Sequence, residues 1–196
     1  MKISNHLNKG IIYYIILFLF STSLVHSQEY ILNNQNSQLT VSGTSSLHDW
    51  DIVAEAQNGT IEINYTSSNL EINTFKIVIT SESLKSGKRG MDKNTYKALK
   101  TNEFENISFQ LTETKSVLDL GNETFQVSAS GTLNIAGATN LVTLNFKLSI
   151  KGNSINIIGE KSIKMTDYKI DPPKALLGTI TTGDEIVIKF NTVLQK

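Results

Sequence analysis

The sequence predicts an all-β, antiparallel fold, and three observations support this prediction. From Leu39 onward apolar side chains recur at every second position, as in LVTLNFKLSI, where Val142, Leu144 and Phe146 share one face. This alternation is typical of antiparallel strands that bury one face. The alternating segments are short and are separated by Gly, Asn and Asp, which favour turns. The chain has only two prolines, and they are adjacent.

The expected strands follow one another through most of the chain. Each places Ile, Leu, Val or Phe on one side and mainly polar residues on the other. They are LTVSG (39–43), TIEINYT (60–66), FKIVIT (75–80), ISFQLTE (107–113), FQVSASGTLNIAG (125–137), LVTLNFKLSI (141–150), SINIIGE (154–160) and EIVIKFNTV (185–193). Strands of this length and spacing build a sandwich or a barrel, and a closed barrel of about eight strands is wide enough to hold a small ligand.

One segment, GMDKNTYKALKTNEF, breaks the strand pattern and predicts a single short helix. Asp92 can cap a helix over residues 92–100. Met91, Tyr96 and Leu99 would then share its core-facing side.

The adjacent prolines lie in DYKIDPPKALLG. Proline removes a hydrogen-bond donor from a strand, so this segment is expected to be a loop or lid.

The first 27 residues are typical of a secretory signal peptide. Lys2 and Lys9 precede the apolar run IIYYIILFLF, and small or short residues follow up to Ser27. The run ends at Phe20, short of the roughly 20 apolar residues that a membrane span needs. We therefore expect cleavage after Ser27, one mature domain over residues 28–196, and a location in the periplasm or outside the cell.

Composition excludes several classes of function. Without Lys2 and Lys9 the chain has 16 basic and 18 acidic residues, and so no general attraction for nucleic acid. It has no cysteine, which excludes disulfides, thiol nucleophiles and thiolate metal sites. His48 is the single histidine after residue 27, whereas a typical zinc site uses several His or Cys ligands. No metal and no cofactor are expected.

His48 and Trp50 stand two residues apart in GTSSLHDWDIVAE. In one extended segment His48 would share a face with Ser46 and Trp50, and Asp49 would point the opposite way. A Ser–His–Asp triad therefore cannot form locally, and the sequence contains no G-x-S-x-G motif. We expect no catalytic residue, and keep a hydrolase or isomerase of apolar substrates that uses His48 as an alternative. Trp50 is expected to be a structural corner or to line a ligand site, with its N–H bonded to a backbone carbonyl.

The segment LKSGKRGMDK is the one concentrated basic stretch. It is either a solvated loop or a basic rim that meets an anionic head group or a membrane surface.

Several blocks in order resemble the YceI-like family of exported bacterial proteins, also called polyisoprenoid- or lipid-binding YceI domains. VSGTSSLHDWDIVAEAQNGTIEI is similar to the opening strands, and ITSESLKSGKRGMDKNTYKALKTNEFENISFQL to the central block. VSASGTLNIAGATNLVTLNFKL matches the pattern G-x-L-x-I-x-G-x-T-x-x-V, and GEKSIKMTDYKIDPPKALLGTITTGDEIVIKF the closing block. The resemblance covers roughly residues 38–194. It departs where many members have an F-x-I-x-H strand and an Arg before a D-[FY]-G element.

The resemblance implies an eight-stranded, lipocalin-like antiparallel barrel with an apolar tunnel that holds an isoprenoid, a quinone or another long-chain lipid. A filled barrel with an interaction or structural role is the alternative, because periodicity alone cannot separate a hollow barrel from a filled one. Transient membrane contact and a homodimer are further expectations. Leu176 and Leu177 are expected to help close the opening. The candidate head-group residues are His48, Lys88 and Arg89. The candidate ligand-binding residues are Trp50, Phe75, Ile77, Ile79, Tyr96, Leu99, Phe109, Leu111, Leu133, Leu144, Phe146, Ile188 and Phe190.

Overall fold

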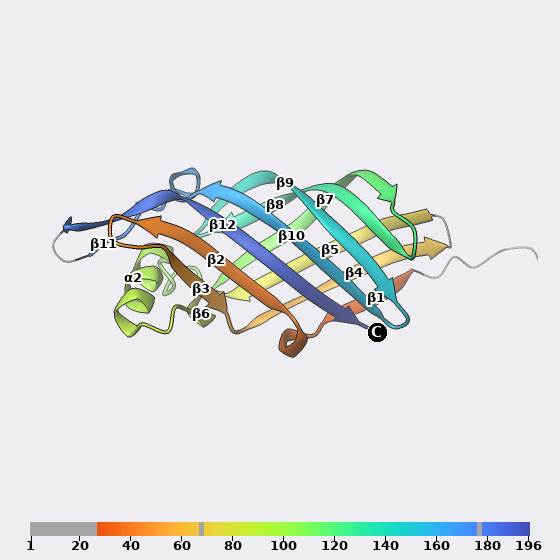
Figure 1. Cartoon of the computed structure of the whole chain (residues 1–196), viewed down its shortest axis with the longest axis horizontal. Coiled ribbons are helices and arrows are strands. Elements are labelled where there is room, and N and C mark those ends of the chain that lie inside the picture. The colour runs from red at the N-terminus through yellow and green to blue at the C-terminus, as the bar shows by residue number, and fades with distance from the viewer. Residues whose placement is uncertain (1–26, 67–68, 176–177) are drawn as a thin grey trace, which may run out of the picture.

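The strands of the computed structural model, which describes residues 27–66, 69–175 and 178–196, form a closed antiparallel barrel (Figure 1). Eight strands follow the ring order β1-β4-β5-β7-β8-β9-β10-β12, and pairing of β12 with β1 closes the ring. This confirms the predicted all-β barrel. The expected signal peptide, apart from Ser27, and the two leucines of the proline loop lie outside the described residues. The strands are β1 (Gln28–Leu32), β2 (Gln38–Ser45), β3 (Trp50–Ala54), β4 (Gln57–Thr66), β5 (Asn69–Thr80), β6 (Leu84–Lys85), β7 (Asn106–Asp119), β8 (Thr124–Ile135), β9 (Ala138–Lys151), β10 (Ser154–Lys164), β11 (Lys174–Ala175) and β12 (Ile180–Gln195).

The two ends of the barrel differ because β12 is long enough to pair with two strands along one edge. Its last residues, Leu194 and Gln195, pair with β1 and close the ring. The segment from Thr182 to Asn191 pairs instead with β2. Strands β2 and β3 form a hairpin, and the short β6 pairs with the outer edge of β3. The wall therefore continues beyond the eight-stranded ring at one end, where helix α2 also lies (Figure 1).

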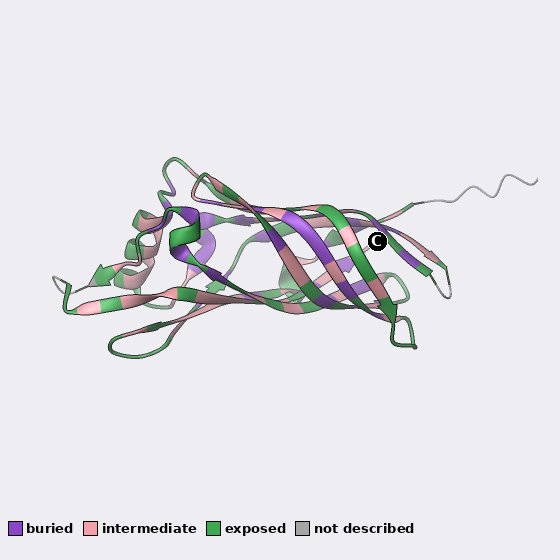
Figure 2. Ribbon diagram, turned by 90° about the horizontal axis from the view of Figure 1, so that it is seen from above, coloured by how far each residue is buried: buried purple, intermediate pink, exposed green. Residues whose placement is uncertain are grey.

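Side chains fill the barrel at the end that β1 closes. Among the described residues, the apolar side chains at 0–1% exposure gather there, and Figure 2 shows buried and exposed positions alternating along the strands. The alternation read from the sequence accounts for this, because every second residue of each strand points inward. The filled core comprises Tyr30, Ile61, Ile63, Phe125, Val127, Ala129, Phe146, Leu148, Ile155, Ile157 and Leu194.

Helix α2 (Arg89–Leu99) begins three residues before the predicted start, so the expectation that Asp92 caps it is wrong. Lys88 occupies the N-cap position without a side-chain cap. The Asp92 carboxylate accepts hydrogen bonds from the backbone N–H and the hydroxyl of Ser86, at 2.8 and 2.6 Å. These bonds hold the pKa of Asp92 below its ordinary value. Asp92 therefore fastens the preceding loop to the first turn of the helix.

The stretch from Gly43 to Glu55 is a hairpin, which corrects the assumption of one extended segment. Ser45 makes the turn, because its backbone N–H and its hydroxyl both donate to the carbonyl of His48, at 3.1 and 2.7 Å. The backbone N–H of His48 donates in return to the Ser45 hydroxyl. These local bonds compete with continued strand structure, as short hydroxyl side chains often do.

Residues 169–173, which include both prolines, form a loop, as predicted for this part of the segment. Pro172 and Pro173 follow the short helix η3 (Met165–Tyr168) and precede β11, which pairs with the start of β12. The carbonyl of Pro173 accepts a hydrogen bond from Thr182. No helix in the described part of the chain is long and apolar enough to cross a bilayer.

Candidate functional site: an apolar cavity in the open half of the barrel

The half of the barrel nearest α2 is hollow. It encloses a cavity of about 810 Å³, within the usual range for sites that bury a small ligand. The exposed residues Leu47 and Lys93 line it, so the cavity reaches solvent at the α2 end. Most of the lining consists of aliphatic and aromatic side chains from the inward faces of β2, β3, β5, β7, β8, β9, β10 and β12.

The cavity ends blindly where the filled core begins. On β12 the lining runs from Ile180 to Thr192, and the next inward residue, Leu194, is fully buried. On β10 the lining begins at Lys161, whereas Ile157 is fully buried. The sequence left a hollow and a filled barrel as alternatives, and the structure contains both, one in each half.

Aromatic rings lie flat over glycines in the wall. A Cβ atom added to Gly43 would meet the indole of Trp50 at 2.2 Å, and one added to Gly159 would meet the ring of Phe190 at 2.6 Å. Each glycine is the cross-strand partner of the aromatic residue that covers it. Because neither glycine has a side chain, the rings can lie along the wall and do not project into the cavity.

Trp50 combines a structural hydrogen bond with a position on the cavity wall. It lines the cavity, and its indole N–H donates to the backbone carbonyl of Thr44 at 3.0 Å. This is the backbone partner that the sequence predicted for the N–H. The ring is therefore fixed on the hairpin at the entrance.

Most of the predicted ligand-binding residues line the cavity. Tyr96, Leu111 and Phe146 do not line it. The lining residues are Trp50, Phe75, Ile77, Ile79, Leu99, Phe109, Leu133, Leu144, Ile188 and Phe190.

The three exceptions have physical explanations. Phe146 points inward but is 1% exposed and packs against Phe75, with ring centroids 6.1 Å apart, so it belongs to the core beneath the cavity. Leu111 is half-buried and packs against the core beside a bulge between β7 and β8. The α2 residues that line the cavity include Met91, Thr95 and Ala98, which share a helical stripe that excludes Tyr96.

Tyr96 instead anchors the helix, with its hydroxyl donating toward the carbonyls of Glu82 and Leu84. Lys85 donates to the same hydroxyl and lies over the ring, 5.0 Å from the centroid.

Sequence reasoning missed part of the lining. Leu39, Val41, Ile163 and Ile186 lie on the inward phase of their strands, so the two-residue period could have identified them. Lys161 has the same phase but lies one residue beyond the predicted strand 154–160, because β10 continues to Lys164. Tyr168 and Ile170 come from η3 and the loop after it, where no period exists to give their direction.

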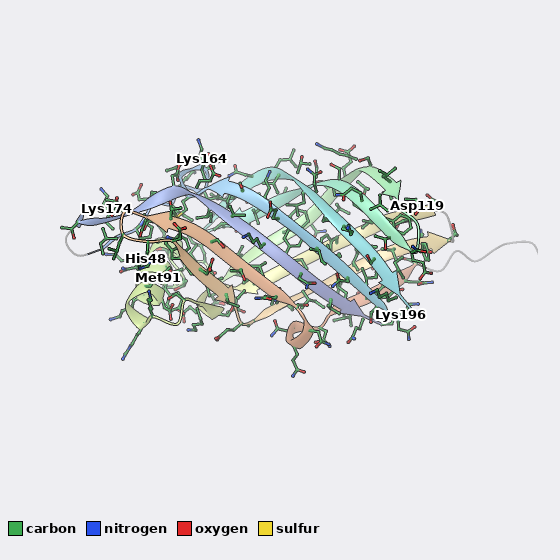
Figure 3. All side chains as sticks on the ribbon, viewed as in Figure 1. His48, Met91, Asp119, Lys164, Lys174 and Lys196 are labelled. Atoms are coloured by element: carbon green, nitrogen blue, oxygen red, sulfur yellow. The ribbon has the colours of Figure 1, made fainter. Side chains whose placement is uncertain are left out.

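Basic residues surround the open end of the cavity. We use "the rim" for His48, Lys88, Lys93 and Lys174, which are exposed and line it. Figure 3 shows His48 and Lys174 at the barrel end that carries α2. No Asp or Glu occurs among the described residues that line the cavity, although two aspartates line a shallower adjoining recess of about 480 Å³.

Two of the three predicted head-group residues lie on the rim. Lys88 and His48 lie on the rim, whereas Arg89 is exposed and does not line the cavity.

The surroundings of His48 do not form a Ser–His–Asp triad. Its Nδ1 lies 2.6 Å from the carbonyl oxygen of Asp49, and neither Ser45 nor Ser46 hydrogen-bonds its ring. The carboxylate of Asp51 accepts from the hydroxyl of Ser42. No group of three or more His, Cys, Asp or Glu that could hold a metal occurs among the residues described.

Two parts of the closing sequence block meet beside the entrance. The carboxylate of Asp184, in the bulge of β12, accepts hydrogen bonds from the backbone N–H and the hydroxyl of Thr166 in η3, at 2.9 and 2.7 Å. These bonds keep the pKa of Asp184 below its ordinary value. The pair fastens η3, which carries the lining residues Met165 and Tyr168, to the strand opposite.

Asp184→Asn is expected to lower the melting temperature at neutral pH by a few degrees, because it removes the charge that strengthens both bonds. The folded-state pKa of Asp184 is depressed, so its contribution is full above the unfolded pKa and is lost as the pH falls through the folded value. The difference in melting temperature between Asp184→Asn and wild type should therefore become smaller as the pH falls below about 4. Melting curves across this range, with Asp171→Asn as an exposed control, test the prediction. A difference that does not change with pH would contradict it.

Comparison with known proteins places the chain among barrels of the same kind. A search of curated proteins found no match. Among solved structures, a polyisoprenoid-binding domain from Saccharophagus degradans, described as implicated in plant cell wall breakdown, has a TM-score of 0.67 at 15% identity. The alignment covers 85% of this chain and 97% of that one.

Two further solved structures have the same fold. BcnA of Burkholderia cenocepacia has a TM-score of 0.65 at 14% identity, covering 83% of this chain and 98% of that one. The YceI protein of Campylobacter jejuni has a TM-score of 0.52 at 17% identity, covering 69% and 80%. The sequence model of the YceI-like domain matches residues 30–194, nearly all of the barrel. The chain therefore belongs to the YceI-like domain family.

Proposed function

We propose that this protein binds one long apolar chain, an isoprenoid, a quinone or another lipid, in the cavity of the open half of the barrel. It carries, stores or sequesters that molecule in the periplasm or outside the cell. The signal-like segment over residues 1–27 is the basis for the location. The protein performs no chemistry on its cargo.

One observation carries the proposal, namely an apolar cavity of about 810 Å³ that is blind at one end. Burial of a methylene group contributes about 0.8 kcal/mol, so a long chain gains affinity from length without many polar contacts. The blind end limits how far a chain can enter. The polyisoprenoid-binding domain of S. degradans supports this function through its shared fold.

The rim adds a role for charge at the entrance. A basic side chain near an anionic membrane surface contributes about 1 kcal/mol of attraction. The rim lysines are therefore suited to transient contact with a membrane from which a lipid is taken.

The geometry around His48 favours binding over catalysis, because no serine hydroxyl or carboxylate of the described residues is bonded to its ring. A hydrolase or isomerase would need such a partner to position the imidazole.

Mass spectrometry of the protein expressed from its full-length gene tests this proposal. The denatured mass should correspond to Gln28–Lys196 if the chain is cleaved after Ser27. The native mass should exceed it by one lipid, which organic extraction then identifies, and it also reports whether the protein is a homodimer. A native mass equal to the denatured one, with no uptake of added polyprenols, quinones or fatty acids, would contradict lipid binding.

A further inference from the structure

Among the described residues that line the cavity, Lys161 is the one charged residue that lies on a strand of the eight-stranded ring. The other lysines and the histidine of the lining come from loops, from α2 and from β11. On β10 the inward phase passes through Ile155, Ile157, Lys161 and Ile163, and the two isoleucines before Lys161 are fully buried. The cross-strand partner of Lys161 is Ile188, which also lines the cavity. The register therefore turns Lys161 into the barrel.

Lys161 lies deep in the barrel, below the rim. The next inward position toward the closed end is Gly159, which is covered by Phe190, and beyond it the filled core begins. Toward the entrance the next inward pair is Ile163 and Ile186. Apolar residues therefore lie on both sides of Lys161 along the strand.

No described residue satisfies the ammonium group of Lys161, which makes no hydrogen bond or ion pair with the part of the chain that the structure describes. An unpaired ammonium against apolar walls is costly unless it is hydrated or paired. A fully apolar lining would avoid that cost. The cavity therefore contains a cation for which the described residues supply no counter-ion.

A second unused donor lines the same cavity. Tyr168 is 2% exposed, and its hydroxyl donates no hydrogen bond to any described residue. The neighbouring side-chain amide of Asn140 faces the hydroxyl only as a donor, and it also donates to the carbonyl of Asp167 at 2.8 Å. Burial raises the pKa of Tyr168, so the hydroxyl keeps its proton at neutral pH. The ammonium can only donate hydrogen bonds, and the O–H of Tyr168 has no acceptor among the described residues, so both groups call for an acceptor on the ligand.

We propose that the cargo is an anionic amphiphile whose carboxylate or phosphate is bound inside the barrel by Lys161, with Tyr168 as a second donor. This inference rests on the proposed lipid-binding function and adds the chemical class of the cargo. It also separates two roles of positive charge: the rim lysines attract the ligand or a membrane, and Lys161 binds the anionic group.

Three probes with the same hydrocarbon chain test the inference. They are oleic acid, oleyl phosphate and oleyl alcohol, which differ only in the head group. The protein is expressed from its full-length gene, and bound lipid is removed before the titrations. Wild-type protein should bind at least one of the two anions more tightly than the alcohol. Lys161→Met should weaken binding of that anion roughly tenfold to hundredfold, the effect of removing a charged hydrogen bond, and leave the alcohol unchanged. The anion with the larger loss distinguishes a carboxylate from a phosphate ligand.

Two variants control for charge and folding. Lys189→Met makes the same substitution on the exposed, outward face of β12 and should leave all three affinities unchanged. Lys161→Arg should keep the preference for the anion. The melting temperature of lipid-free Lys161→Met should equal or exceed that of wild type, because an unpaired ammonium no longer faces the cavity.

The outcomes separate this inference from the proposed function. If the alcohol binds but neither anion binds more tightly, the anionic cargo is wrong and lipid binding stands. If the anion preference survives in Lys161→Met and is lost in Lys88→Met or Lys93→Met, the head group lies at the rim and the inference is overturned. If none of the three probes binds wild-type protein, the proposed function itself fails.

Discussion

Leu144→Trp is expected to abolish tight binding of a long-chain lipid without unfolding the barrel. Leu144 lies on the inward face of β9 and lines the cavity, and it is only partly buried because it faces open space. An indole at this position would extend into the volume that the chain occupies. Each displaced methylene costs about 0.8 kcal/mol, so losing about four of them lowers the affinity by more than ~100-fold.

The same strand offers a matched control for this variant. Leu141 is 70% exposed on the outside of β9, so Leu141→Trp adds the same ring where no ligand is expected. Titration of both variants and wild type with oleyl alcohol, followed by native mass spectrometry, measures the difference. Full occupancy of Leu144→Trp with wild-type affinity would show that the lipid lies elsewhere.

Phe146→Ala is expected to destabilise the protein by about 3–5 kcal/mol, the usual cost of removing a fully buried phenyl ring. Phe146 is 1% exposed, pairs across the sheet with Val127 and Gly159, and packs against Phe75. It lies directly beneath the cavity, so the space left by the ring should also deepen the cavity toward the closed end. The variant should then accept a longer chain than wild type.

Urea unfolding at equilibrium gives the stability difference, and native mass spectra with fatty alcohols of increasing length give the longest chain accepted. Lys147→Ala changes the exposed neighbour and should alter stability by no more than about 0.5 kcal/mol. A loss below about 1.5 kcal/mol for Phe146→Ala would mean that the closed half is loosely packed.

The inward faces of the strands could be predicted from the sequence because side chains alternate in a strand. This period correctly gave the buried phase of β5, β8, β9 and β12, and residues such as Phe75, Leu133 and Ile188 line the cavity as expected. The depth of a residue along the barrel could not be predicted in the same way. Phe146 and Leu144 have the same phase on the same strand, yet one is core and the other faces the cavity.

Local hydrogen bonding decided the features that the period did not cover. The hydroxyl of Ser45 stabilises a hairpin in a segment predicted to be extended. The carboxylate of Asp92, which is predicted to cap α2, accepts a hydrogen bond from Ser86 instead. Such side-chain bonds depend on rotamers and neighbours, so several local structures remained compatible with the sequence. The sequence predicts Tyr96 on the core-facing side of a helix over residues 92–100, whereas α2 begins at Arg89 and Tyr96 does not line the cavity.

The sequence by itself determined an antiparallel barrel with an apolar interior and membership of the YceI-like family, because residue alternation and motif order are properties of the chain. Only the tertiary structure decided which half of that interior is hollow and where its charge lies. Strand register sets the level of each inward residue, and register comes from pairing between distant segments. Pairing of β1 with β12 fills one end, and pairing of β12 with β2 leaves the other open, with Lys161 at the boundary.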